Sequence, residues 1–287
     1  METNKVDQII YEMKGKQTAS NFITLAVIAS LLIIDFFPYF KSWEIINPQF
    51  FYLSVINLFL GIYFYANSNL ISRKLFPILK RSYVFRLYFV FILLCAVSVF
   101  SARNTSLVFI EITQIAIVFC LFINLTILLK DKLNLIYKIV LIIAISAFIQ
   151  SWQQLHNFVI IPRHASILDL LAKMKGNTGN INILAASLTI KIPFLLLGIS
   201  HFSGYKRWFV LFTMFSVTSV IFLTGARTPL INLFLIFFVF IIYTLKTNSF
   251  NKSSFIQVIY IIVPVFISIL FANSILDKFK NKERDSS

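Results

Sequence analysis

Nine long apolar stretches constrain what this chain can fold into more than any other feature. Each is close to the roughly 20 residues that an α-helix needs to cross the hydrocarbon core of a bilayer. Lipid offers the backbone no hydrogen-bond partners, so each stretch is expected to be helical whatever its content of Phe and Ile. The sequence therefore predicts an all-α, polytopic bundle of about nine transmembrane helices. The predicted spans cover approximately residues 22–40, 49–66, 83–101, 106–129, 133–152, 181–200, 207–224, 228–245 and 255–273.

The composition agrees with a membrane protein, because 59% of residues are hydrophobic and only 13% are charged. A soluble domain carries about a quarter charged residues. The net charge of +15 is interpreted as basic cytoplasmic loops, and no nucleic-acid partner is expected, since no basic soluble domain is present. Cys95 and Cys120 lie inside apolar stretches, and no CxxC or Cys/His cluster occurs. The sequence therefore predicts neither a disulfide framework nor a metal site.

Charge asymmetry predicts the orientation of the bundle. With the N-terminus inside, the cytoplasmic segments hold about 13 Lys and Arg and the outer segments about 6, the C-terminal tail set aside. Cytoplasmic loops carry an excess of these residues, so an inside N-terminus is predicted. The domains follow as a cytoplasmic segment 1–21, a transmembrane helical domain 22–273, and the start of a periplasmic loop or tail at 274–287. The first span is interrupted by Asp35 and Pro38.

Two polar clusters precede predicted spans at the outer face, KMKGNTGNIN at 173–182 and TGARTP at 224–229. Each introduces a helix that runs inward, so both helices present free N–H groups and positive dipole ends to the outside. Asn180 and Thr228 are predicted N-caps, with Pro229 in the first turn of the second helix. The glycines of the first cluster allow the tight backbone that such a loop needs.

Two cations stand in apolar surroundings. Arg227, together with the two helix starts, predicts an anion site; the other interpretation is that it snorkels to the outer headgroups. Lys191 lies about 11 residues into the sixth span, roughly 16 Å along the helix. It either faces a water-filled cavity and an anionic ligand, or forms an internal ion pair with Asp35 or Glu111.

Three further polar residues lie in predicted outer loops. Arg103 stands between the third and fourth spans, from where it can reach the same cavity. His156 and His164 belong to the longest outer loop, 153–180. Both are either exposed loop histidines or candidates for activating an acceptor hydroxyl.

Three motifs resemble those of one known family. Gly176–Ser187 (GNTGNINILAAS) resembles the GN-x-N-x-x-A stretch of the O-antigen ligase and O-antigen polymerase family. Leu223–Leu230 (LTGARTPL) resembles its T-x-S/A-R segment at the outer start of a later span. Ala147–Trp152 (AFIQSW) is similar to its G-x-x-Q helix end, with Ala147 in place of the usual Gly. The resemblance covers roughly residues 145–245.

The resemblance implies a membrane glycosyltransferase with a GT-C-like fold that needs no metal or other cofactor. Such an enzyme transfers a glycan from an undecaprenyl diphosphate carrier to the lipid A core or to a growing polysaccharide. The reaction takes place at the periplasmic face of the bacterial inner membrane. The implied partners are the lipid-linked glycan, a lipid or saccharide acceptor, and membrane lipids.

The resemblance also implies roles for particular residues. Arg227 is expected to hold the diphosphate leaving group, whose charge grows in the transition state. His156 and His164 are the candidates for acceptor activation. The full set of expected diphosphate and glycan contacts is Arg227, Lys191, Asn177, Asn180, Asn182 and Arg103.

The resemblance departs from the family at the C-terminal end. The family continues into a large outer loop, with a further Arg and a His, and then into more spans. Residues 277–287 look like the beginning of that loop. We therefore expect the sequence to be a fragment or a truncated relative.

Two other functions compete with glycan transfer. A multi-pass transporter or flippase of an anionic or lipid-linked substrate equally suits a charge within a span. A non-catalytic membrane subunit would use its polar groups only to stabilise the bundle. An outward-open, blind cavity lined by Arg227 and Lys191 would favour the transferase, and a cavity open to both faces would favour the transporter.

Overall fold

The computed structural model is helical throughout most of the chain that it describes, and it contains no strand there. In this part, nine helical segments are long and apolar enough to cross a membrane. They coincide with the predicted spans to within a few residues, which confirms the fold class and makes the chain a multi-pass membrane protein. The residues described are 2–38, 40, 46–67, 81–160, 174–247 and 252–285.

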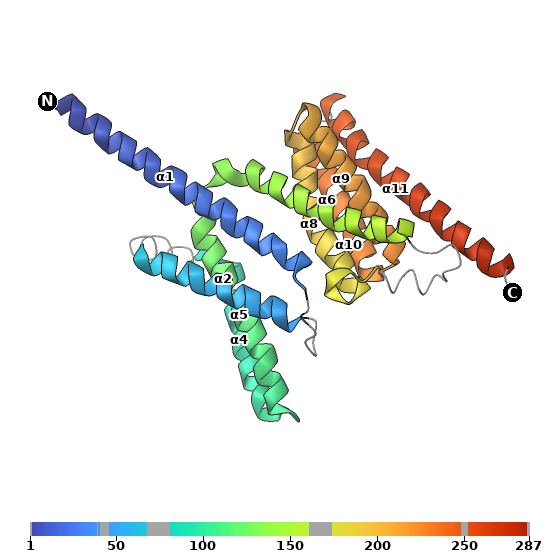
Figure 1. The fold of residues 1–287 in the computed structure, drawn as a ribbon, viewed down its shortest axis with the longest axis horizontal. Coiled ribbons are helices and arrows are strands. Elements are labelled where there is room, and N and C mark those ends of the chain that lie inside the picture. The colour runs from blue at the N-terminus through green and yellow to red at the C-terminus, as the bar shows by residue number, and fades with distance from the viewer. Residues whose placement is uncertain are drawn as a thin grey trace. The chain divides into compact units, whose positions relative to one another are not determined.

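The chain divides into two compact units (Figure 1). Unit 1 consists of Met1–Ile34 and Pro38–Ile136. Its elements are α1 (Glu2–Ile33), α2 (Asn47–Ala66), α4 (Tyr83–Val97), η2 (Ser98–Ser101), α5 (Thr105–Leu129) and η3 (Leu133–Leu135).

The core of unit 1 lies between α2 and α5. Leu60 and Phe64 of α2 are buried against Ile127 and Leu128 of α5. A polar pair adds to this contact, because the Asn124 amide donates a hydrogen bond of 2.9 Å to the side-chain oxygen of Asn57. Amide hydrogen bonds of this kind join helices in membranes. They matter there because an apolar side chain is about as well accommodated by lipid as by another helix.

The first span ends where the sequence predicts an interruption. Helix α1 stops at Ile33, and a 3-10 turn, η1 (Ile34–Phe36), carries Asp35. Residues Asp35–Phe37 belong to the second unit. The short turn therefore contributes the Asp35 carboxylate to a unit that otherwise consists of the C-terminal half of the chain.

Unit 2 consists of Asp35–Phe37 and Tyr137–Ser287. Both polar clusters of the sequence belong to this unit. Its helices are α6 (Ile136–Ile160, from Tyr137 onward), η4 (Gly176–Thr178), α8 (Ile181–His201), α9 (Gly204–Thr224), α10 (Arg227–Thr247) and α11 (Lys252–Asp285).

Helix α9 is the centre of unit 2. It packs against α8 on one side and α11 on another, while α10 packs against α8 (Figure 1). Its Met214, Val217 and Ile221 are fully buried. Small hydroxyl residues fill the close contacts, and the Thr218 and Ser268 hydroxyls join α9 to α11 across 2.6 Å. This central, rigid packing fixes the positions at which α8 and α10 begin.

Two helices extend beyond the first and last predicted spans. Helix α1 runs from Glu2 through the predicted boundary at residue 21, and α11 continues to Asp285 through most of the predicted tail. Ile275 and Leu276 still pack against the core of unit 2, which explains why the helix extends past the predicted end of the span. The predicted domain 22–273 is divided between the two units.

Candidate functional site

The turn between α9 and α10 is only two residues long. Gly225 ends α9 in the left-handed region at φ +61°, where a side chain would be strained. The Thr224 hydroxyl donates to the Ile221 carbonyl at 2.7 Å and accepts from the Ala226 N–H at 3.4 Å. The Ala226 carbonyl then accepts the first helical hydrogen bond of α10, from the Leu230 N–H.

The prediction that Thr228 caps this helix is therefore wrong. Helix α10 begins at Arg227, so Ala226 occupies the cap position and Thr228 lies inside the first turn. The left-handed Gly225 reverses the chain so sharply that no residue remains for a separate capping side chain. Pro229 does lie in the first turn, as expected.

The Gly/Asn loop starts α8 as the sequence predicts. Asn180 is extended and its side-chain oxygen accepts a hydrogen bond of 2.8 Å from the N–H of Asn182. Gly176 and Gly179 adopt φ values of +55° and +65°. A Cβ on Gly176 would lie 3.1 Å from the side-chain nitrogen of buried Gln154 on α6. The loop is thus held close to α6, and α8 begins at a defined place.

The two helix starts share one pocket of about 700 Å³. Every lining residue lies in the first six residues of α8 or α10, in the α9–α10 turn, or at Thr224, the last residue of α9. Six residues of helix span roughly 9 Å, so the pocket occupies one end of these helices. The lining residues are Asn182, Ile183, Ala186, Thr224, Gly225, Ala226, Arg227, Thr228, Pro229 and Asn232.

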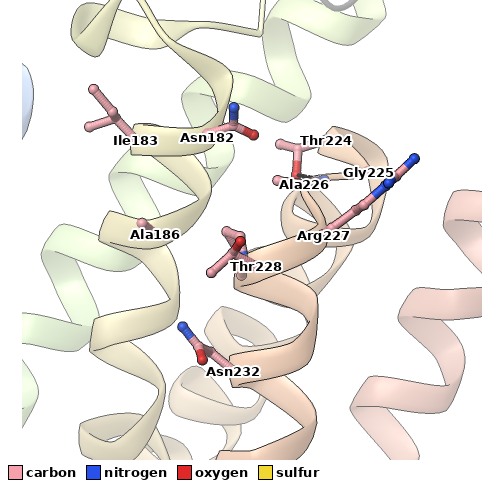
Figure 2. A pocket seen from close by; sticks show the side chains of 10 residues that line it. Asn182, Ile183, Ala186, Thr224, Gly225, Ala226, Arg227, Thr228 and Asn232 are labelled. Atoms are coloured by element: carbon pink, nitrogen blue, oxygen red, sulfur yellow. Dashed lines mark hydrogen bonds between the residues drawn. The ribbon is translucent and has the colours of Figure 1, made fainter.

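Figure 2 shows how the polar side chains of this α8–α10 pocket are directed. Those of Thr228 and Asn232 extend from α10 toward α8, and that of Asn182 extends from α8 toward the α9–α10 turn. The Arg227 side chain is exposed and extends away from α8. The guanidinium thus stands at the rim, and the uncharged amide and hydroxyl groups share the lining with apolar residues such as Ile183, Ala186 and Pro229.

The described lining of the pocket can bind a negatively charged ligand, but its side chains are not suited to transferring a proton near neutral pH. Two helix N-termini and one guanidinium favour negative charge at its mouth. None of its described lining residues is a carboxylate or a histidine. Any general base for a reaction at this pocket would have to come from outside that lining.

Lys191 lies elsewhere in unit 2 and is paired. Its Nζ is 2.7 Å from Oδ2 of Asp35, and it also donates to the side-chain oxygen of Gln150. Ser187 donates to Oδ1 of Asp35 at 2.8 Å and accepts from the Gln150 amide at 3.4 Å. Lys191, Asp35, Ser187 and Gln150 thus form a closed ring of hydrogen bonds, the buried ring. Of the alternatives for Lys191, the ion pair with Asp35 is the one observed.

The other predicted site residues lie apart from the pocket lining. Asn177 is half-buried in η4. Arg103 is exposed in unit 1, between η2 and α5. Glu111, the other proposed partner of Lys191, is exposed on α5.

The structure describes one of the two candidate histidines, and that residue lies on a helix instead of in the predicted loop. His156 is exposed, but it lies on α6, which continues to Ile160 instead of ending near residue 152. The helix continues because Gln154 is buried and Leu155 packs against the core. His164 lies outside the described residues.

The sequence reasoning missed Asn232. It is the only polar residue in α10 between Thr228 and Tyr243. That isolation was the available signal, because a carboxamide in an apolar span needs a hydrogen-bonding environment.

Comparisons with protein-family models, with curated proteins and with solved structures find no match to this chain.

Proposed function

We propose that this chain is a membrane glycosyltransferase resembling the O-antigen ligase and polymerase family. Its reaction would be transfer of a glycan from an undecaprenyl diphosphate carrier to the lipid A core or a growing polysaccharide. The bundle would lie in the bacterial inner membrane with its N-terminus in the cytoplasm, so that α8 and α10 begin at the periplasmic face. The resemblance rests on the motifs in α6, α8 and the α9–α10 turn.

The observation that carries the proposal is the convergence of the two polar clusters on one pocket. They lie more than 40 residues apart in the sequence, yet Asn182 and Arg227 line the same cavity. Two helices that begin side by side present their unpaired N–H groups to a common ligand. A diphosphate with its negative oxygens is a ligand that such a mouth would favour.

Arg227 would act on the leaving group. As the glycosidic bond breaks, negative charge grows on the diphosphate, and a guanidinium stabilises this charge more in the transition state than in the ground state. The side chain is exposed at the rim, so rotation about its own bonds would bring it over the two helix starts. Its planar fork matches two phosphate oxygens, which a lysine ammonium does not.

The cavity that would favour a transferase, lined by both Arg227 and Lys191, is present only in part, because Arg227 lines the pocket and Lys191 does not. Its lining is confined to the first turns of α8 and α10 and the adjoining turn. Lys191, one turn deeper on α8 than Ser187, is held in the buried ring and does not line the pocket. The described lining is thus confined to one end of these helices.

The test is the Arg227→Lys substitution in the full chain. Glycan transfer is expected to be abolished, because the ammonium keeps the charge but loses the bidentate contact. Membrane insertion, followed by the amount of protein in purified membranes, should remain at the wild-type level. The control is Arg86→Lys, the same change at an arginine of α4 in unit 1. Normal transfer by the Arg227→Lys protein would refute the leaving-group role.

A further inference from the structure

A second cavity of unit 2, of about 500 Å³, lies between α9 and α11, which pack side by side (Figure 1). Leu211 and Pro264 are buried at this cavity, whereas Trp208 and Ile259 are exposed, so it is a groove that opens to the outside of the unit. We call it the α9–α11 groove. Its lining residues are Trp208, Leu211, Phe212, Phe215, Ile259, Tyr260, Val263, Pro264 and Ile267.

The groove ends where small hydroxyl side chains bring the two helices together. The Thr218 and Ser268 hydroxyls are 2.6 Å apart, and the Ser268 hydroxyl is 3.0 Å from the Phe215 carbonyl. On α9 the lining runs from Trp208 to Phe215, just before this contact. That segment of helix is roughly 10 Å long. The groove is therefore an apolar channel that closes toward the C-terminal end of α9.

An arginine stands at the other end of the groove. Arg207 precedes Trp208, and its guanidinium carbon is 5.5 Å from the centre of the Tyr260 ring, which lines the groove. Its Nε donates a hydrogen bond of 2.6 Å to the Phe202 carbonyl. The side chain is half-buried, and its two terminal nitrogens have no partner among the described residues. The guanidinium is thus fixed at the groove with donor groups unused.

The surrounding sequence supplies no negative charge to this arginine. No Asp or Glu occurs between Asp169 and Asp277, a stretch that contains α9 and the whole groove-lining part of α11. The neighbouring Lys206 is exposed and adds a second positive charge. A ligand with an anionic group at Arg207 and an apolar chain along the groove would therefore complement both parts of the surface.

We infer that the α9–α11 groove binds an anionic phospholipid, with one acyl chain in the groove and the phosphate at Arg207. A guanidinium matches phosphate oxygens, and the amphipathic rings of Trp208 and Tyr260 are of the kind that lies at membrane interfaces. A second copy of the chain or another apolar helix would cover the lining but would bring no negative charge to Arg207. The inference goes beyond glycan transfer and does not require it.

The orientation proposed above suits this ligand. With the N-terminus inside, α9 begins at the cytoplasmic face, where anionic lipids attract basic residues near the surface. The phosphate at Arg207 would then lie in the cytoplasmic leaflet, and the acyl chain would run along α9 into the hydrocarbon core. The headgroup and the chain therefore follow the polarity of the membrane.

The experiment uses the fluorescence of Trp208. The reporter protein is the full chain with Trp43→Phe and Trp152→Phe, which retains only this tryptophan. It is reconstituted in phosphatidylcholine vesicles that contain dibrominated phosphatidylglycerol or dibrominated phosphatidylcholine, because bromine on an acyl chain quenches a tryptophan that it contacts. The control protein retains only Trp152, which is 50% exposed on α6 and does not line the groove.

Trp208 is expected to show a preference of about fivefold for phosphatidylglycerol, the effect of roughly one basic residue near a membrane surface. Arg207→Gln should reduce it to about twofold or less. Lys246→Gln, which removes an exposed charge from the last turn of α10, should retain it. Val263→Phe should weaken it by narrowing the groove while the arginine remains. Trp152 in the control protein should show no preference.

The opposite results would overturn the inference. Equal quenching of Trp208 by the two lipids would do so, and so would a preference that survives Arg207→Gln. An equal loss in Lys246→Gln would assign the preference to general surface charge. Weak quenching by both lipids that weakens further at higher protein-to-lipid ratios would show that a second copy covers the groove. If the Arg207→Gln protein does not fold, the preference of the reporter protein and its response to Val263→Phe still decide the question.

Discussion

Helix α8 contributes to two polar sites that differ in one respect. In the buried ring, the Ser187 and Lys191 side chains meet Asp35 and Gln150, and every charge has its counter-charge within the chain. In the α8–α10 pocket, near the start of the same helix, the Asn182 side chain faces a cavity and has no hydrogen-bond partner among the described residues. A polar group that is paired within the chain serves the fold, and one that faces an open pocket is a candidate for binding.

The difference has a clear physical origin. The Asp35 side chain is 14% exposed and that of Lys191 is 6% exposed, so both ions are removed from solvent and need each other. Arg227 is exposed at the rim and can remain solvated without a partner in the chain. A cation in an apolar stretch is therefore paired within the chain in one site and exposed in the other.

The largest expected effect comes from breaking the buried ring. Asp35→Asn should lower the free energy of unfolding by about 3–5 kcal/mol, because it leaves the Lys191 ammonium buried without a counter-charge. The double variant Asp35→Asn with Lys191→Met should recover most of that loss, since it removes both charges. Chemical unfolding of the purified protein in detergent measures both values.

The control for the ring is Lys246→Met, which removes an exposed lysine from the last turn of α10. It should leave stability nearly unchanged. If the double variant lost as much free energy of unfolding as Asp35→Asn and Lys191→Met lose together, the ion pair would not act as a unit. The contrast between the buried ring and the pocket would then be wrong.

A smaller effect is expected where the fold shapes the pocket. Gly176→Ala should cost about 1–3 kcal/mol, because it combines a left-handed backbone with a Cβ close to Gln154. Gly225→Ala is the matched control: its φ of +61° carries the same strain, but nothing lies within 4 Å of the added Cβ. It should cost about 1 kcal/mol. If thermal unfolding showed the same loss of stability for both variants, the contact with Gln154 would not position the loop.

The smallest effect is expected at the pocket itself. Arg227→Ala should change the free energy of unfolding by no more than about 0.5 kcal/mol, because the side chain is exposed. The same chemical unfolding experiment measures it. A loss above about 1 kcal/mol would identify Arg227 as a structural residue and weaken its assignment to a ligand.

Local features of the chain were predictable because their physics is local. Each span depends on its own length and hydropathy, so all nine were placed to within a few residues. The Asn180 cap depends on a side chain two residues from its partner N–H. The Thr228 cap failed because the helix start is set by the turn at Gly225, and a two-residue turn leaves little sequence to mark its boundary.

The partners of the polar residues were not predictable in the same way. Asp35 and Glu111 were equal candidates for Lys191, because both are acids in apolar stretches and the chain does not show which one folds back to α8. Asn232 gave a signal only by its isolation in α10, and that signal did not indicate which cavity it lines. The resemblance to O-antigen ligases and polymerases stays a prediction.

By itself, the sequence determined that the chain must be a bundle of membrane-spanning helices, because lipid leaves an apolar stretch no other way to satisfy its backbone. It also determined that two helices begin with polar, anion-favouring segments. Only the tertiary structure decided that these two segments line one pocket, and that Lys191 is neutralised by Asp35 instead of facing that pocket. Such pairings depend on packing between residues far apart in the chain, and that packing brings Asp35 to Lys191 across 156 positions.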